Sequence, residues 1–379
     1  MTSTPLPTIG YAELARRIQG GDSRARIPLS GSWELTFRCN LRCGHCWVNL
    51  PADDADARRR ELALPEIQRI TDEVMEAGCL WMLLTGGEVF LRPDFFALYE
   101  HMKRAGLLLT VYTNGTTISE RVADFLAEWP PRRVEISLYG ITARTYAAVT
   151  GAPALRRCLR GIRLLLDREI NLRLKSPVTT ANYDEFLAIR RFVKEELGLP
   201  EFYYDPNLSY RKVEGRSGFA PARYRVPPEK IVELDRIIDT EGEHGLRDYY
   251  RSPVVRPLET SHVFTCGAGI NNFHIDPYGR LGTCMMVPGH TFDLRRGSFR
   301  QGWEEYFPSL IGRQRERTSR CQSCAIATAC DNCPGWSVLE HGEFEHPNDY
   351  LCEINHRRAE AFGSPALIPI IGRKERTHA

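Results

Sequence analysis

The sequence predicts an α/β protein: a partial (β/α)6 barrel of the TIM type, followed by a smaller module rich in cysteine. Two observations support this fold class. Through the first half of the chain, short β-rich runs alternate with amphipathic stretches of about 10–15 residues, a pattern typical of βαβ units and a parallel sheet. After about residue 255 the alternation stops, and Gly and Cys become frequent.

Six predicted strands alternate with five predicted helices. The strands are Trp33–Phe37, Trp81–Leu84, Leu108–Tyr112, Val134–Leu138, Asn171–Val178 and Glu201–Asp205. The helices between them are Leu64–Ala77, Asp94–Arg104, Ser119–Ala127, Ala154–Asp167 and Tyr183–Leu197. Six strands are too few for a closed eight-unit barrel. Because catalytic groups of such barrels lie at the C-terminal ends of the strands, we expect the functional residues there.

The chain divides into five predicted parts. A short helix at Tyr11–Ile18 precedes the barrel, and a Gly-, Pro- and Arg-rich loop at Arg211–Pro228 leads to a helix at Pro228–Glu241. The parts are an N-terminal lead-in (1–30), the barrel (31–230), a linker helix (231–260), the cysteine-rich module (261–365) and a basic tail (366–379).

Composition and charge exclude several classes of protein. The 379 residues are 42% hydrophobic and 26% charged, close to the globular average. Lys and Arg total 50 against 48 for Asp and Glu, so the chain lacks the excess of basic residues that would predict nucleic-acid binding. The chain shows neither a run of about 18 apolar residues nor a signal peptide. We therefore expect a cytoplasmic protein that does not bind membranes.

Twelve cysteines are unusual for such a protein. A reducing cytosol disfavours disulfides, so clustered cysteines indicate metal or iron–sulfur ligation. Cys39, Cys43 and Cys46 follow the first strand with C-x3-C-x2-C spacing. Three thiolates on one loop can hold three irons of a 4Fe–4S cluster and leave the fourth iron open. The alternative, a zinc site, normally needs four ligands, and His45 stands awkwardly between two of the cysteines.

A C-x3-C-x2-C motif at the end of the first strand of a βα barrel resembles the signature of the radical SAM superfamily. The resemblance implies that the open iron binds the amino and carboxylate groups of S-adenosylmethionine (SAM). It further implies reductive cleavage of SAM to methionine and a 5′-deoxyadenosyl radical, which abstracts hydrogen from a substrate. The predicted enzyme is thus an oxidoreductase or maturase.

The run Thr85-Gly86-Gly87-Glu88 follows the second strand and resembles the GGE element of that superfamily. The resemblance implies that Gly86, Gly87 and Glu88 bind the amino group of SAM. Glycines expose backbone carbonyls, and a carboxylate adds a compensating charge. The alternative is a turn without a ligand.

Further polar residues close the next strands. Asn114 follows the third strand and Ser137 ends the fourth, where the resemblance implies contacts with SAM, to its ribose or carboxylate for Ser137. Lys175, on the fifth strand, is predicted to bind the SAM carboxylate, with a solvated lysine as the alternative. Asp205 ends the sixth strand and is expected to face the substrate.

The C-terminal module contains seven cysteines. Their spacing resembles that of the SPASM domain, which holds auxiliary iron–sulfur clusters. The resemblance implies that Cys321, Cys324, Cys330 and Cys352 fill one cluster, and that Cys266, Cys284 and Cys333 hold another with one thiolate missing. The interval between Cys330 and Cys333 is one residue shorter than the SPASM pattern. Two zinc knuckles, Cys321/Cys324 and Cys330/Cys333, are the alternative. Cys79 and Cys158 are left over and are expected to act as small buried hydrophobes.

These assignments predict SAM and three iron–sulfur clusters as cofactors, and a peptide or protein as the substrate, since SPASM-bearing relatives mostly modify peptides. The alternatives are an enzyme that acts on a small molecule in cofactor, tetrapyrrole or antibiotic biosynthesis, and a non-enzymatic electron carrier. A reductase such as flavodoxin or ferredoxin is the expected electron donor. Because only 32 residues precede the first strand, we also expect either a separate leader-peptide-binding protein or a substrate that is not a leader-bearing peptide.

Overall fold

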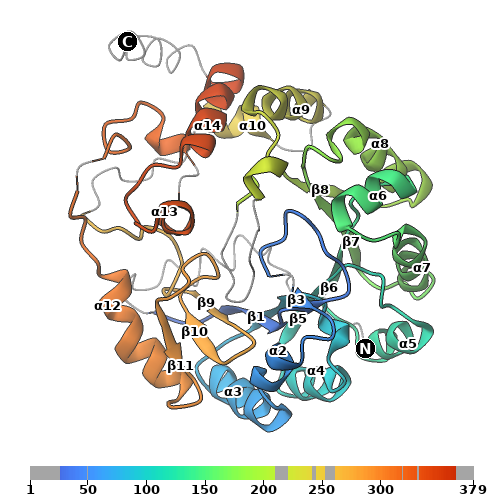
Figure 1. Ribbon diagram of the computed structural model, residues 1–379. Helices are drawn as coiled ribbons and strands as arrows, with labels where there is room; N and C mark the ends of the chain where they lie inside the picture. Colours follow the sequence, from blue (N-terminus) through green and yellow to red (C-terminus); the bar gives the residue numbers. More distant parts are fainter. Residues whose placement is uncertain are drawn as a thin grey trace, which may run out of the picture.

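A computed structural model describes residues 26–48, 50–209, 221–240, 245–251, 261–317, 319–330 and 333–363. Its centre is a nine-stranded sheet in the order β11-β10-β9-β1-β4-β5-β6-β7-β8. The six strands from β1 to β8 are parallel, and helices cover their outer face (Figure 1). The predicted partial barrel is confirmed. The predicted helix at Tyr11–Ile18, the basic tail and most of the loop Arg211–Pro228 lie outside the described residues.

All six predicted strands form within a few residues of their expected bounds. They are β1 (Ser30–Thr36), β4 (Trp81–Gly86), β5 (Leu108–Thr113), β6 (Arg133–Ser137), β7 (Leu172–Pro177) and β8 (Phe202–Asp205). Four helices match as well: α3 (Leu64–Glu76), α4 (Phe95–Arg104), α5 (Glu120–Glu128) and α7 (Leu155–Leu166). The fifth is divided into η2 (Tyr183–Glu185), α8 (Phe186–Arg191) and the π-turn η3 (Phe192–Glu196).

In the described part of the barrel, the prediction missed two α-helices, α2 (Ala55–Arg60) and α6 (Ala143–Thr150). The end signals of α6 are present in the sequence. Thr142 caps its first turn by accepting a hydrogen bond from the backbone N–H of Thr145, and Gly151 ends it in the left-handed conformation with φ of 66°. Its β-branched and aromatic residues mask the helical pattern.

Strand alternation separates an apolar face from a polar one. Leu84, Val111, Ile136 and Leu174 are fully buried and belong to the core, which also includes side chains of the outer helices. The alternate residues face the inside of the open barrel. Strand register aligns Glu34 with Thr85, and Glu135 with both Tyr112 and Arg173. A row of polar side chains therefore crosses the inner face of the sheet.

The C-terminal module continues the barrel sheet. Strand β9 (Asn272–Ile275) pairs in parallel with β1, and β10 (Arg280–Gly282) and β11 (Thr291–Asp293) follow antiparallel. An open barrel leaves the edge of its first strand unpaired, and such an edge needs a partner. The barrel and the module, expected to be separate parts, thus share one sheet, and in Figure 1 the module lies on the open side of the barrel.

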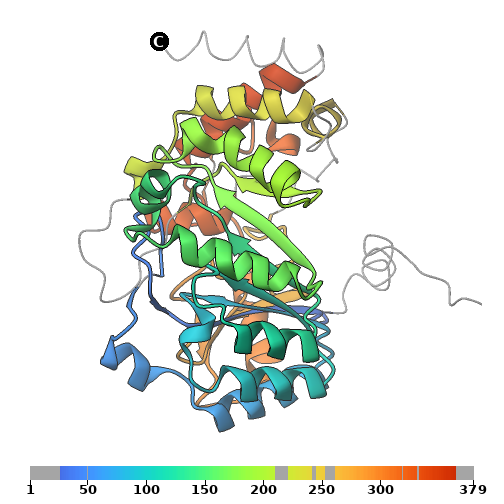
Figure 2. The ribbon, with the colours of Figure 1, turned by 90° about the vertical axis from the view of Figure 1, so that its right-hand side faces the viewer.

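Helices complete the module: α9 (Pro228–Thr240), α10 (Leu246–Arg251), α11 (Phe299–Gln301), η5 (Gly302–Tyr306), α12 (Phe307–Ile311), α13 (Pro334–His341) and α14 (Asp349–Phe362). Helices α9, α10 and α14 pack together, as the two views in Figures 1 and 2 show. Arg358 of α14 forms a buried ion pair with Asp235 of α9, with 2.7 Å between Nε and Oδ2. The predicted linker helix is therefore packed against α14.

A buried polar contact crosses the joint between β1 and β9. The His274 imidazole lies between two residues of β1, with Nε2 3.0 Å from Oε2 of Glu34 and Nδ1 3.0 Å from Oγ of Ser32. Both Glu34 and His274 are less than 5% exposed. This contact ties the module to the inner face of the barrel. In the described part of the chain, no helix is long and apolar enough to cross a membrane.

Candidate functional site

The loop that carries Cys39, Cys43 and Cys46 is held by the backbone around it. Cys39 ends β2 (Arg38–Cys39), which pairs with β3 (Leu50–Pro51). The N–H groups of Arg42 and Gly44 donate to the carbonyls of Thr150 and Val149, at 2.8 and 3.2 Å. The end of α6, a helix missed in the sequence, therefore supports the cysteine loop.

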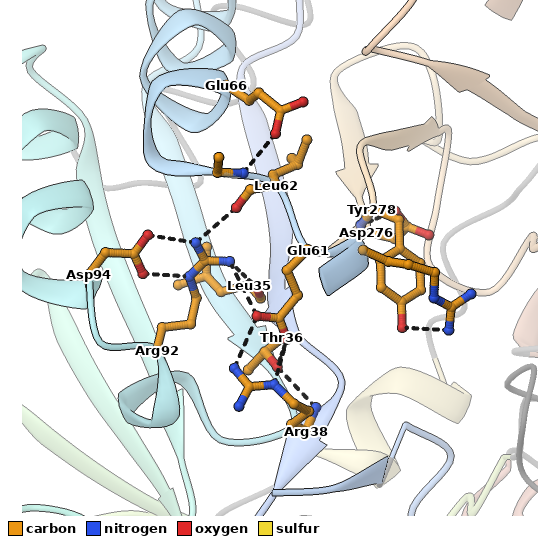
Figure 3. Close-up of polar contacts among 12 residues, drawn as sticks. Leu35, Thr36, Arg38, Glu61, Leu62, Glu66, Arg92, Asp94, Asp276 and Tyr278 are labelled. Carbon is orange, nitrogen blue, oxygen red and sulfur yellow. Dashed lines mark hydrogen bonds and ion pairs between the residues drawn. The ribbon is translucent and has the colours of Figure 1, made fainter. Parts of the chain in front are cut away.

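A buried ion network fixes the chain just before Cys39 (Figure 3). Two guanidinium nitrogens of Arg38 donate to the two carboxylate oxygens of Glu61, at 2.8 and 3.0 Å. Arg92 lies beside Glu61 and donates to the carbonyls of Leu35 and Leu62, at 3.1 and 2.9 Å. The network joins the end of β1 to the segment after β4. Sequence reasoning did not identify it, because none of its residues belongs to a recognisable motif.

The two glycines of the GGE element allow β4 and β1 to approach closely. Gly86 has φ of +123°, and a Cβ there would lie 2.2 Å from the carbonyl oxygen of Thr36. At Gly87 a Cβ would lie 2.1 Å from the carbonyl oxygen of Arg38. Any larger residue would push the end of β4 away from the start of the cysteine loop.

The structure buries the Glu88 carboxylate completely. It accepts hydrogen bonds from the Thr113 hydroxyl at 2.8 and 2.9 Å, from the Asn114 N–H at 2.9 Å and from the Thr117 hydroxyl at 3.0 Å. Burial raises the pKa of Glu88, and these hydrogen bonds oppose the rise. The contacts join the ends of β4 and β5. Direct contact with SAM would require this carboxylate to exchange one of its present partners.

Asn114 links the third strand to the cysteine loop. Its amide nitrogen donates to Oδ1 of Asn40 at 2.9 Å and lies 3.7 Å from Sγ of Cys39. Its amide oxygen accepts from the N–H of Thr116 at 2.9 Å. The side chain is 7% exposed. Asn114 is therefore placed to orient Cys39.

A cavity of about 480 Å³ opens at the carboxyl ends of the strands. Among the predicted site residues, those that line it are Cys46, Gly86, Ser137, Lys175 and Asp205. It is large enough for a small cofactor. The C-terminal module contributes Met285, the residue after Cys284, to the same wall. The cavity thus borders the cysteine loop, the strand ends and the cysteine-rich module.

Charged and aromatic side chains on the inner face of the sheet form the floor of this cavity. Lys175 donates to Oε2 of Glu135 at 3.1 Å and lies 2.9 Å above the ring of Tyr112. Burial lowers the pKa of Lys175 to about 8. Arg173 lies 3.6 Å from Oε1 of Glu135 and stacks on Tyr203. Glu135 and Arg173 were missed, although each stands two residues before a predicted site residue and so shares its face of the strand.

Tyr139 also lines the cavity and contacts the cysteine loop. Its side chain hydrogen-bonds Cys43 and Ser137. The ring packs on that of His45, with 5.4 Å between the centroids. Burial raises the pKa of Tyr139 well above its usual value. The aromatic wall thus positions Ser137 beside the cysteine loop.

Four thiols of the module meet at a second cavity, of about 140 Å³. They belong to Cys321, Cys324, Cys330 and Cys352. His356, which was not predicted, lines the same cavity with Nε2 3.6 Å from Sγ of Cys324. Hydrogen bonds to Cys324 and Cys352 raise the pKa of His356 to about 10.

The remaining thiols of the module, those of Cys266, Cys284 and Cys333, do not line this cavity. Burial, with a smaller contribution from the charge of the nearby Cys266, raises the pKa of Cys333. A Cβ built on Gly335 would meet both Cys333 Sγ, at 3.3 Å, and Met286, whose N–H donates to Cys284 at 3.4 Å. Cys333 is therefore near Cys266 and the Cys284 loop, and it is absent from the lining of the cavity that holds Cys330.

In the part of the chain that the structure describes, no three Cys, His, Asp or Glu side chains converge as the ligands of one metal ion would. Each cysteine of an iron–sulfur cluster binds a different iron, so the thiolates are spaced more widely. Cys79 and Cys158 stand outside both groups and are buried in the core, as expected; burial raises the pKa of each to about 12.

Comparison with known families identifies the barrel. Residues 33–193 match the model of the radical SAM superfamily. The chain carries a radical SAM domain. The match begins in β1 and includes the cysteine loop, the GGE element, Asn114, Ser137 and Lys175.

Curated relatives are similar to most of the chain. The AdoMet-dependent heme synthase of Methanosarcina barkeri is 24% identical and covers 84% of this chain and 95% of its own. The subtilosin biosynthesis protein AlbA of Bacillus subtilis is 25% identical over 77% of this chain and 62% of its own. The mycofactocin maturase MftC of Mycobacterium tuberculosis is 26% identical over 80% and 77%.

Solved structures share the fold. Streptococcus suis SuiB bound to S-adenosylmethionine matches with a TM-score of 0.66 and 16% identity, over 90% of this chain and 81% of its own. The enzyme anSMEcpe with bound AdoMet matches with a TM-score of 0.67 and 16% identity, over 91% and 100%. The chain is a radical SAM enzyme, which uses SAM and an iron–sulfur cluster.

Proposed function

We propose that this radical SAM enzyme modifies a peptide, with the barrel cavity as the site where SAM and the peptide side chain meet. One observation carries the proposal: a single cavity borders Cys46 of the radical SAM loop and Met285 of the cysteine-rich module. The substrate class is supported by the similarity to AlbA and MftC, and by the fold shared with SuiB, which has been solved with its precursor peptide SuiA.

Cys39, Cys43 and Cys46 are proposed to hold the radical SAM cluster. With SAM bound, such a cluster would supply the electron that cleaves SAM into methionine and the 5′-deoxyadenosyl radical, which is the species that abstracts hydrogen from a substrate. Gly86 offers backbone to the SAM amino group, and Lys175 and Ser137 offer a cation and a hydroxyl from the cavity wall. Gly87, Glu88 and Asn114 support this wall from behind through their contacts with Thr36, Thr113 and Cys39.

Two auxiliary clusters are proposed in the module. The shared cavity of Cys321, Cys324, Cys330 and Cys352 supports one complete set of four thiolates. Cys266, Cys284 and Cys333 form the second set, with the fourth ligand unassigned. The zinc-knuckle alternative pairs Cys330 with Cys333, which is less compatible with the position of Cys333 beside Cys266. A flavodoxin or ferredoxin as electron donor, a separate leader-peptide-binding protein and a cytoplasmic location stay predictions.

A tetrapyrrole substrate is the second candidate. The similarity to the AdoMet-dependent heme synthase covers 95% of that protein, and the cavity contains Arg173 and Lys175, which could meet propionate groups. Both cations already contact Glu135, however, and Glu34, Glu135 and Asp205 add carboxylates to the same cavity. This balance of charge favours a peptide over a polyanionic ring.

The test uses the full-length enzyme, reconstituted anaerobically with iron and sulfide and reduced with dithionite. Candidate peptides, chosen from short reading frames beside the gene, and iron porphyrins are each added with SAM. We expect a peptide to stimulate 5′-deoxyadenosine formation and to change in mass, with deuterium transferred from labelled peptide. The C39A/C43A/C46A variant is the control. A porphyrin that is modified while peptides are not would overturn the peptide proposal.

A further inference from the structure

His356 stands directly above one of the module thiols. It lies four residues after Cys352 on α14, so the two side chains share a helix face. Because side chains lean toward the N-terminus of a helix, the imidazole of His356 reaches back over Cys352. Its Nε2 is 3.6 Å from Cys324 Sγ, and it also hydrogen-bonds Cys352. One imidazole thus contacts two of the four thiols.

The same imidazole lies between the cavity of the four thiols and a depression on the protein surface. Cys352 and His356 line the cavity of about 140 Å³ that holds the thiols, and they also line an outer depression of about 580 Å³. The other residues of that depression are Arg320, Asp349, Glu353, Arg357 and Glu360. Arg320 and Arg357 are paired with Asp349 and Glu353, and all four side chains are well exposed. Solvent screens those exposed charges, whereas His356 contacts the sulfurs directly.

Hydrogen bonds to sulfur are a main determinant of the potential of an iron–sulfur cluster. A donor withdraws electron density from the thiolate and favours the reduced cluster. We propose that His356 is a positioning residue that donates hydrogen bonds to Cys324 and Cys352, and thereby raises the reduction potential of the auxiliary cluster held by Cys321, Cys324, Cys330 and Cys352. This inference rests on the proposed function, because it assumes that these cysteines hold a cluster.

The experiment uses full-length protein with the C39A/C43A/C46A background, so that only auxiliary clusters give signals. Redox titration followed by electron paramagnetic resonance compares the cluster potentials of this protein with those of its His356→Leu and His356→Gln variants. Leucine removes the donor, and glutamine restores an N–H at a similar distance. We expect His356→Leu to shift the oxidised-to-reduced ratio of one cluster about tenfold at fixed potential, or about 59 mV for one electron. His356→Gln should restore most of the wild-type potential, and the iron content should be the same in all three proteins.

Three controls separate the outcomes. His341→Leu, which removes an exposed histidine elsewhere in the module, should leave both potentials unchanged. An unchanged potential in His356→Leu with full iron content would overturn the inference, and so would equal shifts in the leucine and glutamine variants. Loss of one cluster in His356→Leu would also overturn it, by making His356 a ligand. If C321A/C324A retains all iron, the proposed cluster itself is wrong, which is a separate result.

Discussion

The barrel and the cysteine-rich module hold their thiols in different ways. In the barrel, three cysteines on one short loop are positioned by polypeptide contacts: the Arg38–Glu61 pair before the loop, α6 beneath it and Asn114 beside it. In the module, seven cysteines come from distant segments and meet between short elements. We infer that the cysteine loop of the barrel adopts its conformation before a cluster binds, whereas the module needs bound clusters to fold.

The hydrophobic cores of the two regions also differ, because the barrel has a large core and the part of the module around the four thiols has a small one. One large apolar core includes the barrel and extends into β9, β10 and the helices around Trp303. The part of the module around the four thiols has a small core of its own. Its buried members are Val232, Tyr250, Ile326, Ala329, Ala359 and Phe362. A core of this size gives little stability by itself, so ligation by metal is expected to contribute much of the folding energy there.

The largest expected effect tests this difference directly. The C39A/C43A/C46A variant should make no 5′-deoxyadenosine, yet keep its circular dichroism spectrum and the iron of the module. C321A/C324A should instead lose iron and become sensitive to proteases between Ser319 and Phe362, because the small local core cannot hold this segment together. Limited proteolysis with mass spectrometry identifies the cut sites. Equal protease resistance in both variants would contradict the comparison.

An intermediate effect concerns SAM binding in the barrel. Burial lowers the pKa of Lys175 to about 8, so its ammonium loses its proton as the pH rises through this value. SAM affinity should therefore fall above pH 8, if Lys175 binds the carboxylate. Lys175→Met should weaken binding about 10- to 100-fold at pH 7, the cost of one charge-assisted hydrogen bond of about 1.5–3 kcal/mol, and abolish the pH dependence.

Lys175→Arg provides the matched control, because its guanidinium stays charged across this range. It should bind SAM with an affinity that no longer changes between pH 7 and 9. The free energy of unfolding of the wild type should show the opposite trend and rise with pH. Between pH 8 and the usual lysine pKa, Lys175 holds its proton in the unfolded chain but loses it in the folded one, so unfolding becomes less favourable as the pH rises. Calorimetric titration gives the affinities. A wild-type affinity independent of pH would remove Lys175 from the SAM site.

The smallest expected effect concerns the joint between the two regions. His274→Leu removes a buried hydrogen-bond partner from Glu34 and Ser32, and should lower the free energy of unfolding by about 1–3 kcal/mol. The control is His101→Leu, which breaks an exposed pair with Asp72 and should cost at most about 1 kcal/mol. Urea denaturation measures both. Similar losses would show that the joint adds nothing beyond a surface contact.

Strand and helix patterns in the sequence predicted most of the barrel. Local periodicity was sufficient for β4 to β8, because β4 to β7 bury Val, Ile or Leu on their outer face and β8 buries Phe202. The division of the predicted helix 183–197 into η2, α8 and η3 was missed, and so was α6, whose β-branched and aromatic residues mask the helical pattern. Among the site residues, Gly86, Ser137 and Lys175 were placed by motif or strand position. Glu135 and Arg173 were accessible to the same period-two argument.

By itself, the sequence determined the order of strands and helices and the spacing of the cysteines, since both depend on neighbours along the chain. Tertiary structure alone decided which distant groups meet. Strand β9 covers the free edge of β1, because the open barrel leaves that edge unpaired. Glu88 is buried between β4 and β5, and His356 lies over Cys324, through contacts between segments far apart in the chain. Local patterns carry no record of such pairs, because burial and hydrogen bonding select them only when the chain is packed.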